Sequence, residues 1–274
     1  MKSFGLALGG GGARGIAHIA VLEALDEMGV RPAAVAGTSI GSLIGAAYAA
    51  GMSGKEIRRY VVGLAHDRSE MFRRALAARA GSFTSIFKQG LGSATLLDAE
   101  KLCSQFLPEA IPEDFGALKL PLIVVASDIH RREQVAFSTG ALKPALAASI
   151  ALPTLVRPVV VDERILIDGG ATNPLPFDQL SGRVDVIVAV DISGEPSDTR
   201  RDIPNPWECM FTTVLVMGNA ITSEKLKHGA PDLMVRPKVG IFRTLDFLQA
   251  SAILRAAEPA KAEIKEKLAA LLGS

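Results

Sequence analysis

Residues Val35 to Ala47 read V-A-G-T-S-I-G-S-L-I-G-A-A and contain a G-x-S-x-G pentapeptide, Gly37-Thr38-Ser39-Ile40-Gly41. A short β-prone run precedes the pentapeptide, and small and apolar residues suited to a helix follow it. A nucleophilic serine needs this strand-turn-helix setting, because a strained turn pushes its hydroxyl out of the backbone. The helix that begins there directs free N–H groups and its positive dipole end at negative charge near that hydroxyl.

A second glycine-rich segment, Gly9 to Gly15, follows an apolar run and opens a helix-like segment. Its Gly10-x-Gly12-x-x-Gly15 spacing fits a dinucleotide fingerprint, but the next strand ends in Ala36-Gly37 rather than in the required acidic residue. A Walker loop is excluded because no Gly-Lys-Ser/Thr follows. An oxyanion loop fits better, in which Arg14 is either an extra positive charge for a phosphate headgroup or an ion-paired structural residue.

Strand-like and helix-like segments alternate along the chain. The hydrophobic patterns predict strands over 3–8, 33–36, 121–126, 156–161, 165–167, 184–190 and 233–236, and a hairpin strand over 134–138. They predict helices over 16–28, 40–50, 54–62, 98–106, 141–150 and 207–228, and C-terminal helices over 245–272. This alternation predicts an α/β fold of three layers, α/β/α, with a mostly parallel central sheet and helices on both faces.

The composition indicates a folded enzyme-sized chain. Its 274 residues are 49% hydrophobic and 22% charged with a net charge of +1, so the composition suggests neither disorder nor a nucleic-acid partner. No Pro/Gly/Ser-rich or charged linker divides the chain, so we expect a single domain over 1–274, with the helices of 206–274 part of it. No apolar run is long enough to span a bilayer, and the glycines come too early for a signal-peptide core, so we expect a cytoplasmic protein.

Three loops should meet beyond the carboxyl ends of the strands, where functional groups gather in such sheets. They are 9–15, 37–41 and 168–172, and together they supply a hydroxyl, a carboxylate and backbone N–H groups. Acyl transfer requires this set: a nucleophile, a base and donors for the oxyanion.

Asp168 is a better candidate for the base than any of the four histidines. None of the four histidines lies in a recognisable loop, and each is expected to be an ordinary core or surface residue; they are His18, His66, His130 and His228. An α/β-hydrolase of the usual kind would also place more strands before its nucleophile. Asp168 ends a strand and precedes Gly169-Gly170, although an aspartate before a Gly-Gly turn is also common as plain structure.

Four blocks together resemble the patatin-like phospholipase family, in its order. They are Gly10-Gly11-Gly12-Ala13-Arg14-Gly15, Gly37-Thr38-Ser39-Ile40-Gly41, Ala148-Ser149-x-x-x-Pro153, and Asp168-Gly169-Gly170 with Asn173-Pro174. The resemblance spans 2–193 and implies a Ser–Asp dyad, with Ser39 as nucleophile and Asp168 as base. It implies an oxyanion loop of Gly10, Gly11 and Gly12 with Arg14, and motif glycines at Gly15, Gly37, Gly41, Gly169 and Gly170. The compact chain is similar to bacterial esterases of the neuropathy-target-esterase type, and no motif is assigned after Gly194.

We therefore expect a serine esterase or phospholipase that cleaves acyl esters of phospholipids or lysophospholipids through an acyl-enzyme. The alternatives are a transacylase on the same fold and a lipid-binding regulatory protein of low turnover. No cofactor and no metal are expected, because the chain shows no ligand spacing, and Cys103 and Cys209 are expected to be core thiols. The sequence leaves the oligomeric state open.

The basic, phenylalanine-bearing segment 68–91, within a loosely patterned region over 64–97, bears on lipid contact. Apolar side chains, among them Met71, Phe72, Phe83 and Phe87, alternate there with arginines. Such a segment is either a lid or peripheral membrane-contacting patch, or a solvated helix whose apolar stripe meets the core.

Overall fold

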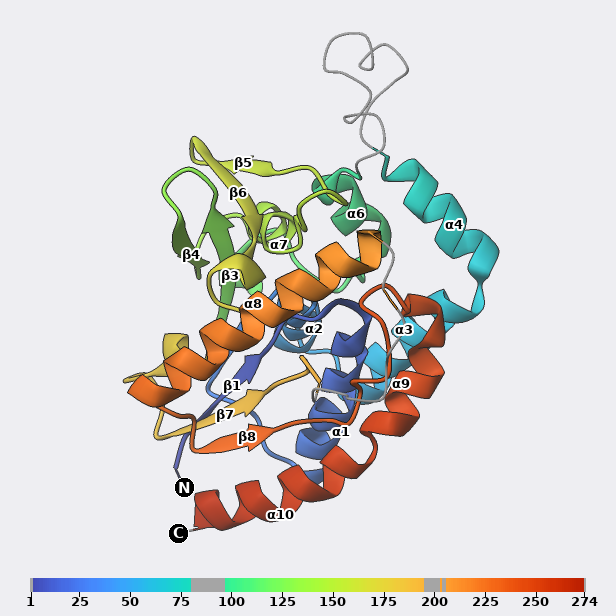
Figure 1. Ribbon diagram of the computed structural model, residues 1–274. Coiled ribbons are helices and arrows are strands. Elements are labelled where there is room, and N and C mark those ends of the chain that lie inside the picture. The colour runs from blue at the N-terminus through green and yellow to red at the C-terminus, as the bar shows by residue number, and fades with distance from the viewer. Residues whose placement is uncertain (1, 80–96, 195–202, 204–205, 274) are drawn as a thin grey trace, which may run out of the picture.

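The computed structural model describes residues 2–79, 97–194, 203 and 206–273, built around a mixed sheet of eight strands (Figure 1). The order of strands is β5-β6-β3-β2-β1-β7-β8, with β4 also paired to β3. The strands are β1 (Phe4–Leu8), β2 (Ala34–Thr38), β3 (Leu122–Asp128), β4 (Glu133–Phe137), β5 (Val159–Val161), β6 (Arg164–Asp168), β7 (Val186–Val190) and β8 (Leu233–Val235).

Helices connect and cover these strands. The α-helices are α1 (His18–Met28), α2 (Ile40–Ala49), α3 (Gly54–His66), α4 (Arg68–Ala77), α6 (Ala99–Phe106), α7 (Leu142–Ser149), α8 (Pro206–His228), α9 (Ala250–Ala257) and α10 (Pro259–Gly273). The 3₁₀ turns are η1 (Gly12–Ala17), η3 (Phe115–Ala117), η4 (Gly169–Ala171), η5 (Phe177–Leu180) and η6 (Phe247–Gln249). The three-layer α/β/α prediction is confirmed.

The sheet is parallel at its centre and antiparallel at one end. Strands β3, β2, β1, β7 and β8 run parallel, as predicted. At the other end, β4 and β6 run antiparallel to β3, and β5 runs antiparallel to β6. The prediction of a mostly parallel sheet with a hairpin strand over 134–138 is therefore confirmed. Tight turns at 129–132 and 162–163 make β3–β4 and β5–β6 antiparallel, whereas parallel neighbours need a long crossover.

The two faces of the sheet differ in side-chain size. Phe4, Leu6 and Leu8 of β1 belong to the main core beneath α1 and α2, whereas Ala7 belongs to the second cluster, with Phe177 of η5. The small side chains on the second face let η5 pack close to the sheet, and α8 lies across this side (Figure 1). The prediction of helices on both faces is therefore confirmed.

Of the two thiols, Cys103 is buried as expected, but Cys209 is exposed, so the expectation of a core thiol is wrong for Cys209.

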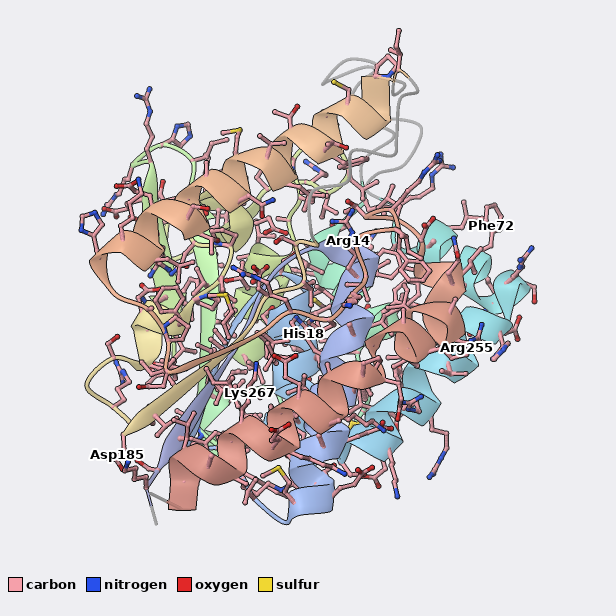
Figure 2. The ribbon with its side chains drawn as sticks, turned by 60° about the horizontal axis from the view of Figure 1, so that its bottom comes forward. Arg14, His18, Phe72, Asp185, Arg255 and Lys267 are labelled. Atoms are coloured by element: carbon pink, nitrogen blue, oxygen red, sulfur yellow. The ribbon has the colours of Figure 1, made fainter. Side chains whose placement is uncertain are left out.

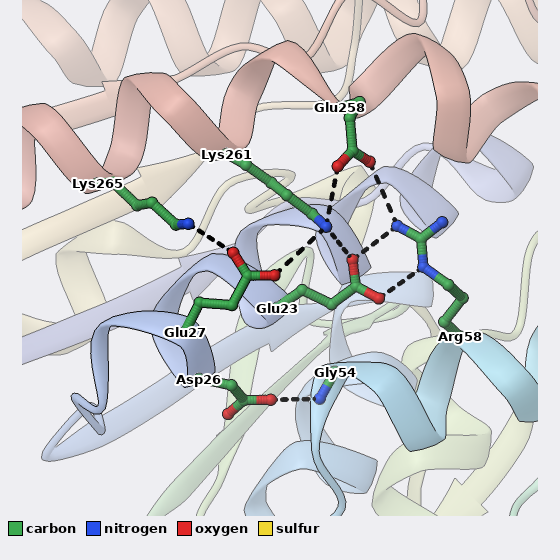
Figure 3. Close-up of polar contacts among 8 residues, drawn as sticks. All are labelled: Glu23, Asp26, Glu27, Gly54, Arg58, Glu258, Lys261 and Lys265. Atoms are coloured by element: carbon green, nitrogen blue, oxygen red, sulfur yellow. Dashed lines mark hydrogen bonds and ion pairs between the residues drawn. The ribbon is translucent and has the colours of Figure 1, made fainter.

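A network of charges joins α1, α3 and α10 (Figure 3). Glu23 of α1 is 3% exposed and accepts two hydrogen bonds of 2.6 Å from Arg58 of α3, one on each carboxylate oxygen. The Nζ of Lys261 of α10 lies 2.5 Å from Oε2 of the same carboxylate. The predicted capping box starts α3: the Ser53 hydroxyl accepts from the Glu56 N–H, and the Glu56 carboxylate accepts from the Ser53 N–H. The ion pair between Glu23 and Lys261 ties the last helix, α10, to α1.

Candidate active site

Ser39 occupies the sharp turn between β2 and α2. Its φ of 54° and ψ of −128° are unusual for a residue with a side chain and place it as the N-cap of α2. A Cβ on Gly37 would lie 2.6 Å from the Ser42 Cα, and one on Gly41 would lie 2.2 Å from the Leu8 carbonyl oxygen. The turn therefore accepts no side chain at these two flanking positions, which explains the glycines of the pentapeptide.

The hydroxyl of Ser39 donates a hydrogen bond of 2.6 Å to Oδ2 of Asp168. The other carboxylate oxygen, Oδ1, accepts the N–H of Gly170 at 2.8 Å. Asp168 is 6% exposed, and this burial raises its pKa to about 6 although the bonds from Ser39 and Gly170 act in the opposite direction. A carboxylate of this pKa is deprotonated at neutral pH and is more basic than an ordinary aspartate.

Asp168 reaches Ser39 by a route that the sequence reasoning did not foresee. It lies at the end of β6, which is antiparallel to β3 and is not one more strand of a parallel sheet. Strand β4 pairs with one edge of β3 over 124–128. Strand β2 pairs with 122–125 and β6 pairs with 126–128. Because both ranges overlap that of β4, β2 and β6 must share the other edge of β3. The carboxyl ends of β2 and β6 therefore meet end to end, which brings Ser39 and Asp168 together.

The glycine loop lies against the same turn. A Cβ on Gly10 would lie 3.3 Å from the Ser39 Cβ, and Gly10, Gly11 and Gly12 line the cavity at Ser39. The Gly10 N–H donates to the Pro174 carbonyl at 2.9 Å, so it is not an oxyanion donor in this structure. The N–H groups of Gly11, Gly12 and Ile40, which no carbonyl of the described residues accepts, are the better candidates.

The remaining motif glycines are sites of close packing around the dyad. A Cβ on Gly15 would lie 2.3 Å from the Ile40 side chain, and a Cβ on Gly169 would lie 2.2 Å from the Val125 carbonyl oxygen. Gly170 contributes the N–H that donates to Asp168.

Arg14, labelled in Figure 2, ties the glycine loop to distant parts of the chain. Its Nε donates to the Phe242 carbonyl at 2.8 Å, and its Nη1 donates to the Ser193 carbonyl. The neighbouring Ala13 N–H donates to the Thr244 carbonyl at 2.8 Å. Of the two roles weighed for Arg14, the structural one agrees with these contacts.

The histidines contribute no base to this arrangement. His18 is fully buried and its Nε2 lies 2.8 Å from the Gly9 carbonyl, which identifies Nε2 as the protonated nitrogen (Figure 2). Burial lowers its pKa to about 4, so the ring is neutral at physiological pH. His66, His130 and His228 are exposed at the surface.

A cavity of about 510 Å³ opens at Ser39 and Asp168 and runs between α2, α3, α6 and α8. Its wall is mainly apolar; contributors include Leu43, Ile57, Val61, Phe106, Leu215 and Phe247. Helix α8 and the η6 region come from the part of the chain to which the sequence assigned no motif. This part of the cavity wall was therefore missed, because apolar wall residues carry no signature other than ordinary helical periodicity.

Helix α4 stands at the edge of this cavity. Met71 and Ala75 line it, while Phe72 is 71% exposed and points outward at the surface (Figure 2). The helix thus has one face toward the cavity and one toward solvent. Phe83 and Phe87, on which the lid hypothesis also depended, lie outside the described residues.

Among the described residues, no three His, Cys, Asp or Glu side chains come together as ligands for a metal ion. No helix in the described ranges is both long and apolar enough to cross a bilayer.

Residues 6–181 match the sequence profile of patatin-like phospholipases. The chain belongs to the patatin-like phospholipase family. The resemblance carried by the four sequence blocks is thereby confirmed. The matched range contains Ser39 and Asp168 and ends within the turn that follows η5.

This patatin-like protein has relatives of much greater length. An uncharacterized NTE family protein of Mycobacterium tuberculosis is 34% identical over 198 residues, which is 72% of this chain and 51% of the relative. Lysophospholipase NTE1 of Coccidioides immitis is 28% identical over 90% of this chain and 16% of its own length. Patatin-like phospholipase domain-containing protein 7 of Rattus norvegicus is 30% identical, with 90% and 19% covered. The chain thus spans about half the length of the mycobacterial relative and less than a fifth of the length of the other two.

Solved structures share the fold at low sequence identity. VipD from Legionella pneumophila superposes with a TM-score of 0.54 at 16% identity, over 97% of this chain and 66% of VipD. Human GIVD cytosolic phospholipase A2, in complex with methyl gamma-linolenyl fluorophosphonate, gives 0.52 at 13% identity, over 99% and 60%. These likenesses concern the fold alone.

Proposed function

We propose that this protein is a serine esterase or phospholipase that hydrolyses acyl esters of phospholipids or lysophospholipids through a covalent acyl-enzyme. The single observation that carries the proposal is the 2.6 Å hydrogen bond from the Ser39 hydroxyl to Asp168 at the mouth of a largely apolar cavity. Relatives named as phospholipases and a lysophospholipase favour lipid esters over other acyl compounds.

In the first half of the reaction, the Asp168 carboxylate takes the proton of Ser39 while Oγ attacks the ester carbonyl. The N–H groups of Gly11, Gly12 and Ile40 face the oxyanion, aided by the positive end of α2. Collapse of the tetrahedral intermediate breaks the bond to the leaving alcohol, which takes the proton from Asp168. In the second half, Asp168 removes a proton from water, which attacks the acyl-enzyme, and then returns that proton to Ser39 as the acid leaves.

The apolar cavity suits the acyl chain of such a substrate. A wall of leucine, isoleucine, valine and phenylalanine side chains stabilises a buried alkyl chain by about 0.8 kcal/mol for each methylene removed from water. We also propose that the whole stretch 1–274 acts as one catalytic unit, because the main core contains both Phe4 and Leu272.

We further propose peripheral contact with a lipid surface through α4. Phe72 and Leu76 are 71% and 49% exposed on this helix, next to Met71 and Ala75 of the cavity wall. Phe72→Ser should lower the rate on phospholipid vesicles several-fold and leave the rate on soluble p-nitrophenyl butyrate unchanged. Equal loss on both substrates would contradict an interfacial role.

The central test is reaction with a fluorophosphonate, followed by mass spectrometry of the labelled peptide. Ser39 should be the labelled residue, and Ser39→Ala should abolish both labelling and fatty-acid release from lysophosphatidylcholine. A folded protein that resists labelling and releases no fatty acid would favour a lipid-binding protein. Transfer of the acyl group to added glycerol in preference to water would favour a transacylase.

A further inference from the structure

The hydrogen-bond ladder between β2 and β3 is interrupted at its last rung. The Val35 N–H donates to the Pro121 carbonyl, and rungs of a parallel ladder repeat every two residues. With Thr38 opposite Val125, the rung after β2 would join the Ser39 N–H to the Val125 carbonyl. The Ser39 N–H instead donates to the Ser149 hydroxyl at 2.9 Å, and that hydroxyl donates to the Val125 carbonyl at 2.7 Å. One side chain replaces the missing rung.

The same end of α7 also holds the second member of the dyad. Ser149 is the last residue of α7 and is fully buried. Two residues later, the Ala151 carbonyl accepts the N–H of Asp168 at 3.0 Å. The segment from Ser149 to Ala151 therefore contacts the peptide of the nucleophile and the peptide of its base.

We propose that Ser149 is a positioning residue for the Ser39–Asp168 dyad. Its inserted hydroxyl separates the Ser39 peptide from β3, which lets the backbone leave the β conformation for a φ of 54° and directs Oγ at Asp168. Without the hydroxyl, the Ser39 N–H either stays unpaired or forms the direct rung to Val125. The direct rung would draw Ser39 back toward β2 and move Oγ from the carboxylate.

This role presupposes the acyl hydrolase reaction proposed above, but it assigns a residue that does not touch the substrate. Ser149 must both accept and donate a hydrogen bond, which among small side chains requires a hydroxyl. Alanine does neither, and cysteine has a similar size but is a weak donor and a weak acceptor. The chemistry at this position can therefore be separated from its packing.

The experiment measures the rate of fluorophosphonate labelling at Ser39, together with kcat and KM on p-nitrophenyl butyrate, in folded full-length variants. Ser149→Ala and Ser149→Cys should each lower the labelling rate and kcat by about 10- to 100-fold, with KM changed by less than about threefold. Ser149→Thr keeps the hydroxyl and should retain most of the wild-type labelling rate. If the added methyl group unfolds Ser149→Thr, the proposal is decided by Ser149→Ala and Ser149→Cys.

Ser127→Ala is the matched control. Ser127 is also buried, at 2% exposure, and its hydroxyl bonds to that of Thr172 at 2.7 Å, without contact to Ser39. It should lose a comparable amount of thermal stability and keep its labelling rate. Labelling of Ser149→Ala at the wild-type rate, or equal slowing in Ser127→Ala, would overturn the positioning role while leaving the proposed function intact. A wild-type protein that is neither labelled nor active would overturn both.

Discussion

Glu23 and Asp168 are both nearly buried carboxylates, at 3% and 6% exposure, yet their surroundings shift their pKa values in opposite directions. Burial alone raises the pKa of Glu23, but hydrogen bonds from Arg58 and Lys261 outweigh this effect and leave the pKa below its ordinary value. Asp168 is bonded to a hydroxyl and a backbone N–H, and burial raises its pKa to about 6. Burial with cations stabilises the charge, whereas burial without them leaves a carboxylate ready to accept a proton.

The two carboxylates also differ in what they connect. Glu23 joins three helices that come from both ends of the chain (Figure 3), so its charge contributes to the fold. Asp168 joins the ends of two strands at the cavity mouth, where the same degree of burial creates a base. Substitutions should therefore separate stability from activity.

The largest effect is expected from Asp168→Asn. The amide cannot accept the proton of Ser39, so kcat should fall by about 10³-fold or more, measured on p-nitrophenyl butyrate. Asp128→Asn is the control, because Asp128 is 3% exposed at the end of β3, beside β6, but accepts the backbone N–H groups of His130 and Arg131. A kcat for Asp168→Asn within tenfold of wild type would rule out Asp168 as the base.

The same variant has a testable effect on stability. The folded-state pKa of Asp168 is raised, so the stability contributed by its protonated form is present below its ordinary pKa near 3.8 and is lost as the pH rises through about 6. Asp168→Asn should therefore unfold at a higher temperature than wild type at pH 8 and at a similar temperature near pH 4.

Glu23→Gln should act on the fold and spare the reaction. It leaves Arg58 and Lys261 without their shared carboxylate, and breaking a buried ion pair costs about 3 kcal/mol, seen as a fall of several degrees in Tm. Glu263→Gln, which removes an exposed i,i+4 pair with Lys267, should cost less than about 0.5 kcal/mol. A loss of kcat in folded Glu23→Gln, measured well below its Tm, would break the separation between the two regions.

In the wild-type protein, the pH dependence of kcat/KM should reflect the protonation of Asp168, and that of stability should reflect the protonation of Glu23. As the base must be deprotonated, kcat/KM should rise about tenfold per pH unit below pH 6 and level off above it. The Glu23 pKa is lowered, so its stabilisation is present above the ordinary value of 4.5 and is lost only as the pH falls through its lower folded pKa. Activity should thus decline on acidification before the fold does. A kcat/KM midpoint near pH 4 would contradict the raised pKa of Asp168.

The smallest effect is expected from His228→Ala, which removes a 79% exposed side chain paired with Glu224. Its kcat should stay within about twofold of wild type, and the same holds for exposed His66 and His130. His18 differs from these three histidines, because it is buried and its Nε2–H donates a hydrogen bond to the Gly9 carbonyl in the glycine loop. A large loss of kcat in folded His228→Ala would favour a conventional triad.

The local features of this protein could be predicted from its sequence. The Ser39 turn, the glycine loop, the capped start of α3 and the alternating strands and helices depend on residues close together in the chain, whose conformational preferences can be read directly. Asp168 was also found, because it ends an apolar strand and precedes two glycines.

The way in which these features meet could not be predicted from the sequence. The end-to-end arrangement of β2 and β6, the bond from Ser149 into the broken ladder, the carbonyl partners of Arg14 and the contribution of α8 to the cavity all join residues distant in sequence. No local preference encodes such pairings, since a serine at a helix end or a leucine on a helix face has the same pattern whatever it contacts. The pKa of Asp168 likewise depends on burial and on which charges lie near it, and packing of the whole chain sets both.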